Sequence, residues 1–103
     1  MRKNNTFLFE KSKFGIEEIA KANYIDFVGL FGSYARGEET DDSDIDLFVK
    51  FDFSKKSVGL FELYRIQKQL EQLLGKKVDL VTKPNKLIMP FIEEDLLTIY
   101  ERR

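Results

Sequence analysis

The chain has 103 residues, 43% hydrophobic and 34% charged, which suffices for the core of one soluble globular domain and leaves no room for a second. Seventeen basic and eighteen acidic residues give a formal net charge of −1, so no overall attraction to nucleic acid or an anionic membrane is indicated. Histidine and cysteine are both absent, which excludes an imidazole base, thiolate catalysis, disulfides and zinc held by these residues.

The N-terminal residues 1–5 are polar and lead into no apolar segment of signal-peptide length. No other apolar run is long enough for a transmembrane helix. We therefore expect a single domain over residues 1–103, located in the cytoplasm. Proton transfer and metal binding must fall to Asp, Glu, Lys or Tyr, because these are the titratable groups that the sequence offers.

The first half of the chain predicts one long helix and two strands with a short helix between them. Ser12 is expected to cap a helix that ends at Tyr24, with one face formed by Phe14, Ile16, Ile19, Ala20 and Asn23. The apolar run 27–31 predicts a buried strand, followed by a short helix over 33–37 and a charged turn over 38–42. From Ile45 to Phe51 the alternation predicts a second strand, with one face formed by Ile45, Leu47, Val49 and Phe51 and the other by Asp44, Asp46, Phe48 and Lys50.

The second half predicts a long helix, a third strand and a short closing unit. Ser57 is expected to cap a helix through Leu74 that ends at Gly75 and has an apolar stripe of Leu60, Leu63, Ile66, Leu70 and Leu73. Residues 77–81 predict a strand, which Pro84 ends. Asn85 or Lys86 is expected to begin a last helix, which Pro90 restricts to the stretch near 91–95, and residues 97–100 predict an edge strand.

Strands that alternate with helices indicate an α+β fold with α/β-like alternation, in which a small sheet is covered by helices on one face. The chemistry is then expected on the other face. The sequence contains no internal repeat, low-complexity segment or linker.

Three aspartates are predicted to share this uncovered face. Asp44 and Asp46 are two residues apart, so they project from the same side at a spacing of about 7 Å by strand rise. Asp79 joins them, because its neighbours Val78 and Leu80 point into the core. Three carboxylates repel each other unless cations neutralise them, and Mg²⁺ commonly binds one or two carboxylates together with substrate phosphates. The pattern therefore predicts a Mg²⁺ site with two ions, of the kind used in phosphoryl and nucleotidyl transfer.

A simpler interpretation fits the same residues. The run from Asp41 to Asp44 also suits a solvated turn, with Asp46 exposed on its strand and Asp79 paired with a neighbouring lysine, Lys76 or Lys77. We keep this interpretation for Asp41 and Asp42. The run Asp42–Asp46 also begins like an EF-hand loop, but Leu47 and Phe53 stand where that loop needs glycine and glutamate, which argues against calcium sensing.

The motif Gly32-Ser33-Tyr34-Ala35-Arg36-Gly37 lies between a predicted strand and a helix, a position where phosphates bind. Gly32 lets the backbone approach a triphosphate closely, while the Ser33 hydroxyl and adjacent N–H groups donate to it. Arg36 is expected to contact phosphate or to brace the loop against Asp44 or Glu39. Because Glu38-Glu39 replace the Lys-Ser/Thr of a P-loop, a Walker-type ATPase is excluded.

Three segments together resemble the minimal nucleotidyltransferase (MNT) domains of the DNA polymerase beta superfamily. They are Gly32-Ser33-x-Ala35-Arg36-Gly37, Ser43-Asp44-Ile45-Asp46-Leu47 and Val78-Asp79-Leu80-Val81, in the family's order. The whole chain has the size of such a domain, and its Ile99-Tyr100 region is similar to their ends. The resemblance implies the nucleotidyltransferase fold, a mixed sheet with helices packed against it, and Mg²⁺-dependent transfer of a nucleoside monophosphate from ATP or another NTP.

Carried over by position, the resemblance makes Asp44 and Asp46 metal ligands. Asp79 completes the metal site or acts as the base. Gly32 and Ser33 hold the triphosphate, and Arg36 fits the family motif. No residue of the three motifs departs from the active pattern.

Many free-standing members of this family are antitoxins of HEPN-domain toxins, and some transfer AMP to a toxin hydroxyl. The resemblance thus implies a HEPN-domain partner protein and a hetero-oligomer. A non-catalytic module that masks its partner is the alternative function. Transfer to a small molecule such as an antibiotic ranks last, because it usually requires a helical partner domain that this chain lacks.

Overall fold

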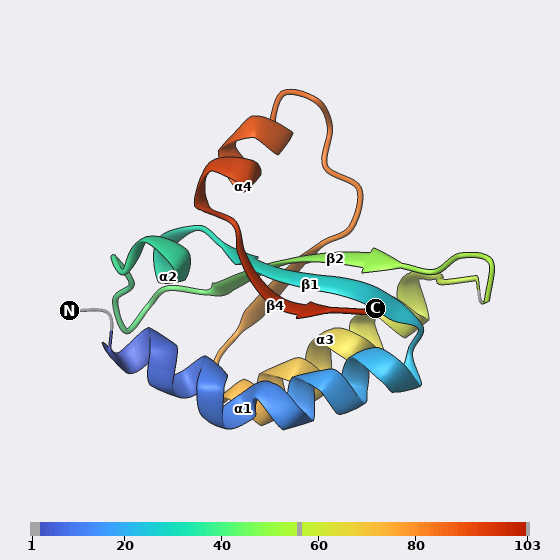
Figure 1. The fold of residues 1–103 in the computed structure, drawn as a ribbon, viewed down its shortest axis with the longest axis horizontal. Coiled ribbons are helices and arrows are strands. Elements are labelled where there is room, and N and C mark those ends of the chain that lie inside the picture. The colour runs from blue at the N-terminus through green and yellow to red at the C-terminus, as the bar shows by residue number, and fades with distance from the viewer. Residues whose placement is uncertain (1–2, 56, 103) are drawn as a thin grey trace.

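The four β-strands form one mixed sheet in the order β3-β2-β1-β4 (Figure 1). The computed structural model describes residues 3–55 and 57–102. Its strands are β1 (Ile25–Phe31), β2 (Ile45–Phe51), β3 (Val78–Val81) and β4 (Leu97–Glu101). β1 is antiparallel to both β2 and β4, whereas β2 and β3 are parallel. The predicted β2 and the predicted edge position of β4 are confirmed.

Two long helices, α1 (Lys3–Ala22) and α3 (Leu60–Leu74), lie side by side on one face of the sheet, as Figure 1 shows. The predicted inward face of β2 is fully buried against them, and the core cluster also includes Ile16, Val28, Ile66, Leu70 and Val78. The predicted fold class is therefore confirmed. The short α2 (Ser33–Arg36) follows β1, and α4 (Met89–Asp95) lies over the opposite face.

The opposite face of the sheet is only partly open. Phe48 on β2 is 4% exposed and packs edge-on against Phe27, with ring centroids 6.0 Å apart. Ile92 of α4 is 1% exposed, so this short helix, which lies over the opposite face of the sheet in Figure 1, also buries apolar surface. This face of the sheet is therefore partly covered by apolar side chains.

The predicted start of the first helix at Ser12 is wrong, because α1 already includes Lys3 and places Ser12 in its interior at 4% exposure. The buried stripe runs through Phe9, Ser12, Ile16, Ala20 and Asn23, and Phe14 is 73% exposed. Serine can cap a helix only where the chain before it is not helical; here it is a small side chain at a buried position. The helix ends at Ala22, before Tyr24 adopts a φ of 56°.

The predicted cap of α3 at Ser57 is also wrong, because the helix begins after Gly59, whose N–H donates to Glu62 Oε1 at 3.1 Å. Its buried face is Ile66, Leu70 and Leu74, while Leu60 and Leu73 of the predicted stripe are 85% and 36% exposed. The predicted end is confirmed: Gly75 has a φ of 73° and donates to Glu71 O at 2.8 Å.

The last helix begins at Met89, later than either predicted start, Asn85 or Lys86. Asn85 Oδ1 accepts hydrogen bonds from the N–H groups of Leu87 (2.9 Å) and Ile88 (3.0 Å), which closes a turn before α4. Pro90 lies in the first turn of α4, where its missing N–H costs little. In the described part of the chain, no helix is long and apolar enough to cross a membrane.

Two substitutions in α3 test which residues form the core. Ile66→Ala should lower the free energy of unfolding by about 2–5 kcal/mol, because it leaves a cavity at a position that is 1% exposed. Leu60→Ala should change it by less than about 0.5 kcal/mol, because that side chain contacts mainly water. Urea denaturation measures both. A similar loss for the two variants would contradict the assigned face.

Candidate functional site

Two of the predicted site aspartates occupy neighbouring positions on adjacent strands. The parallel register of β2 and β3 aligns Asp46 with Asp79, and it aligns the core-facing Leu47 with Leu80. Asp44 directly precedes β2, whose first residue, Ile45, donates its N–H to Lys77 O at 2.8 Å. The shared face predicted for Asp46 and Asp79 is thus a property of the fold.

Burial and the charge of its neighbours both disfavour the ionised form of Asp46. Asp46 is half-buried, and its pKa is raised, first by this burial and then by the negative charges of Asp79 and Asp44. The positive charge of Arg36 opposes this shift and lowers the pKa of Asp46. A cation beside Asp46 would therefore relieve repulsion that the fold itself creates.

The aspartates suit a metal ion that completes its coordination with water and substrate phosphates. Over the described residues, no group of three or more acidic side chains is arranged to hold a metal ion by itself. Mg²⁺ typically uses one or two protein carboxylates and completes its shell with water and substrate phosphates. The aligned pair Asp46 and Asp79, with Asp44 nearby, matches this donor set.

Gly32 lies directly against the carboxylate of Asp46. It follows the last residue of β1, Phe31, which is the register partner of Asp46. A Cβ at this position would collide with the Asp46 carboxylate and lie 3.1 Å from its Cγ. The backbone also has φ 79° and ψ −154°, a region that only glycine enters readily. Two independent constraints therefore require glycine here.

The predicted short helix α2 is a single turn bounded by two glycines. Arg36 N donates to Gly32 O at 3.1 Å, Glu38 N donates to Ser33 O at 2.9 Å, and Gly37 adopts a left-handed φ of 74°. Tyr34 is 5% exposed and anchors the turn in the core. Ser33, which directly follows Gly32, is consequently held near the aspartates.

Arg36 forms two ion pairs that the sequence did not indicate. Its Nε donates to Glu38 Oε1 at 2.9 Å, and one terminal nitrogen donates to Asp95 Oδ2 at 2.7 Å. These two carboxylates raise the pKa of Arg36. The predicted bracing partners were Asp44 and Glu39, whereas the structure makes the brace with Glu38 and with a residue of α4.

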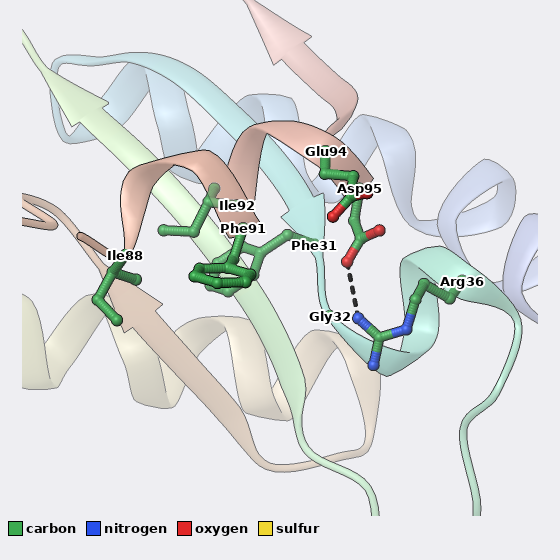
Figure 2. Close-up of a pocket in the computed structure, with 8 residues that line it drawn as sticks. All are labelled: Phe31, Gly32, Arg36, Ile88, Phe91, Ile92, Glu94 and Asp95. Carbon is green, nitrogen blue, oxygen red and sulfur yellow. Dashed lines mark hydrogen bonds and ion pairs between the residues drawn. The ribbon is translucent and has the colours of Figure 1, made fainter. Parts of the chain in front are cut away.

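A pocket of about 390 Å³ opens between α2 and α4 beside this motif (Figure 2). Its lining combines an apolar wall with three charged side chains, and consists of Phe31, Gly32, Arg36, Ile88, Phe91, Ile92, Glu94 and Asp95. Figure 2 shows the rings of Phe31 and Phe91 on one side and the Arg36–Asp95 pair on the other. Sequence analysis missed the α4 residues, because no motif marks them and only the packing of α4 brings them to Gly32.

Gly32→Ala tests the two constraints on Gly32 together, with Gly75→Ala as the control for a left-handed glycine that has open space around it. Both glycines have positive φ, but a Cβ at Gly75 would meet nothing within 4 Å. Gly75→Ala should cost about 1–2 kcal/mol of unfolding free energy from backbone strain alone. Gly32→Ala should cost clearly more, measured by urea denaturation. Equal losses would show that contact with Asp46 does not constrain Gly32.

Asp46→Asn tests the repulsion among the aspartates. Without metal, in EDTA at neutral pH, this variant should be more stable than the wild type by about 0.5 kcal/mol, typical of like charges on adjacent strands. Because the folded pKa of Asp46 is raised, its ionisation costs stability as pH rises through that pKa. The difference should therefore shrink on acidification. Thermal melting across pH measures it, and a less stable variant at neutral pH would contradict the repulsion.

Comparison with known proteins identifies the family. A family model described as nucleotidyltransferase domain matches residues 15–100. A Methanocaldococcus jannaschii protein, provisionally named protein adenylyltransferase MJ1379, is 42% identical over 87 residues, 81% of this chain and 86% of that protein. Protein adenylyltransferase MntA of Thermococcus cleftensis is 40% identical over 73 residues, 71% of this chain and 62% of that protein.

The fold is also similar to a chain in a solved structure of a tri-AMPylated Shewanella oneidensis HEPN toxin in complex with MNT antitoxin. The TM-score is 0.67 at 18% identity, over 90% of this chain and 72% of that chain. This likeness concerns the fold, whereas the family model and the closer relatives concern the sequence. The resemblance carried by the three motifs is confirmed, and the chain belongs to the nucleotidyltransferase domain family.

Proposed function

We propose that this protein transfers AMP from ATP to a hydroxyl group of a partner protein in a Mg²⁺-dependent reaction. The alignment of Asp46 with Asp79 directly beside Gly32 carries the proposal. It puts oxygen donors suited to Mg²⁺ next to backbone that can approach a triphosphate closely. The names of the two sequence relatives support AMP as the transferred group and a protein as the acceptor.

Each of the three sequence motifs has a role in this proposal. Mg²⁺, in two ions, would be held by Asp44 and Asp46 together with water and the phosphates of ATP, which leaves Asp79 as the base. The triphosphate would be bound by the motif after β1, through Gly32, Ser33 and Arg36. The raised pKa of Asp46 supports the metal assignment, because a nearby cation would offset both the burial of its charge and the repulsion from Asp79 and Asp44 that raise it. Bound Mg²⁺ supplies positive charge that offsets the negative charge on the phosphates and the departing group.

In the proposed reaction the acceptor hydroxyl oxygen attacks the α-phosphorus of ATP. The new phosphorus–oxygen bond forms as the bond from the α-phosphorus to the α,β-bridging oxygen breaks, and pyrophosphate leaves with that oxygen. Asp79 takes the proton of the hydroxyl group. Its exposure on β3 suits this role, because the acceptor comes from another molecule.

We infer further that the acceptor is a HEPN-type toxin and that this protein is its antitoxin, together forming a hetero-oligomer. The name MntA of one relative and the fold likeness to an MNT antitoxin complex support this. Apolar side chains that a protein partner would cover are exposed near the C-terminal end of the chain: Leu87 by 81%, Phe91 by 69% and Leu97 by 50%.

The same exposed side chains favour one competing function, a module that masks its partner without modifying it. In that case the aspartates would be dispensable for neutralisation. No observation favours a small-molecule acceptor, because the pocket beside Gly32 is explained by the nucleotide that the main proposal places there.

Co-expression with the neighbouring-gene product separates the two functions. Wild-type protein should add whole AMP units to that partner, detected by intact-mass spectrometry, and should rescue growth. Asp44→Asn and Asp46→Asn should abolish the added mass and the rescue, because the Mg²⁺ ligands are lost. Asp42→Asn is the control, since Asp42 is exposed in the preceding turn.

If the Asp44 and Asp46 variants rescue growth as well as the wild type does, masking is the function. If they still modify the partner at the wild-type rate, the site assignment is wrong.

A further inference from the structure

The ion pair between Arg36 and Asp95 joins the motif after β1 to a helix that lies 59 positions later in the chain. The bond is short, at 2.7 Å, and the Asp95 side chain is only 17% exposed, whereas that of Arg36 is 44% exposed. Asp95 is therefore the more buried partner. A short charge-assisted hydrogen bond to a largely buried carboxylate restricts the guanidinium that it holds.

The direction of the Arg36 side chain is set from two sides. Glu38 accepts from Nε within the loop itself, and Asp95 accepts from a terminal nitrogen across the pocket. Figure 2 shows the guanidinium beside Gly32 at the rim of the pocket, on the side away from Phe91. The positive charge of Arg36 also acts on Asp46, where it opposes the rise in pKa that burial and the neighbouring aspartates cause.

The position of α4 does not depend on this ion pair alone. Ile92 is 1% exposed and packs α4 against the sheet, and the pair with Asp95 lies one turn further along the helix. Removing the charge of Asp95 should therefore leave α4 in place and change mainly the freedom of Arg36.

We propose that Asp95 is a positioning residue that holds the Arg36 guanidinium at the mouth of the α2–α4 pocket, ready to meet the triphosphate of the nucleotide. This rests on the proposed function, because it takes Arg36 as a nucleotide-binding residue. A long side chain that is already ordered loses less entropy when it binds phosphate. The residue that sets this order belongs to α4, outside the three motifs of the family resemblance.

Binding of AMP-PNP in the presence of Mg²⁺, measured by isothermal titration calorimetry on the full chain, tests the role of Asp95. Asp95→Asn should weaken binding about fivefold, the scale of one lost hydrogen bond. Asp95→Glu, which keeps the charge, should restore part of the affinity. Glu93→Gln on the same helix should bind as the wild type does, because Glu93 is exposed and does not line the pocket.

A double-mutant cycle shows whether Asp95 acts through Arg36. In an Arg36→Gln background, Asp95→Asn should cause no further loss of affinity, because the group that it positions is absent. An equal additional loss in that background would overturn the proposal. So would unchanged affinity of Asp95→Asn alone in a wild type that binds AMP-PNP. A wild type that does not bind AMP-PNP with Mg²⁺ would overturn the proposed function itself.

Discussion

The parallel pairing of β2 with β3 is the constraint on which the rest of the site depends. It sets Asp46 and Asp79 side by side in one register while Ile45, Leu47 and Val78 enter the core on the other face. A shift of one residue would turn the carboxylates inward, where burial of a charge is costly. The buried apolar partners therefore enforce a cluster of negative charge that does not favour folding by itself.

This repulsion gives the site its chemical character. Partial burial and then the neighbouring carboxylates raise the pKa of Asp46, and the positive charge of Arg36 opposes them. Stabilising interactions elsewhere, chiefly the packing of α1 and α3 on the covered face, offset this cost. Such a balance between a stable scaffold and an unfavourable charge cluster is common at functional sites.

The opposite wall of the site comes from a part of the chain that carries no recognisable motif. α4 lies over the same face as the aspartates and contributes Phe91 and Asp95 to the pocket beside Gly32. An apolar ring and a carboxylate of α4 thus lie across the pocket from Gly32. In this candidate site the aspartates and the glycine turn come from the nucleotidyltransferase motifs, and Phe91 and Asp95 come from α4.

The sequence by itself determined the features that depend on local pattern. Strict alternation predicted β2 and the outward direction of its aspartates, and Gly75 marked the end of α3. Local pattern failed at the helix starts: Ser12 lies inside α1, where the preceding residues are helical, and the helix predicted from Ser57 begins only after Gly59. Local pattern also predicted that Leu60 and Phe14 lie on buried faces, whereas both are exposed. Helical spacing shows which residues share a face, but it does not show how far along the helix another element covers that face.

Tertiary structure alone decided how distant segments meet. Alternation within each strand predicted that Asp46 and Asp79 share a face, but the pairing of β2 with β3 aligns them. The collision that excludes a Cβ at Gly32 appears only when β1 and β2 pair. The Arg36–Asp95 ion pair spans 59 positions and has no signal in the sequence. An ion pair depends on the relative placement of two elements, which is fixed by packing and not by the residues adjacent in the chain.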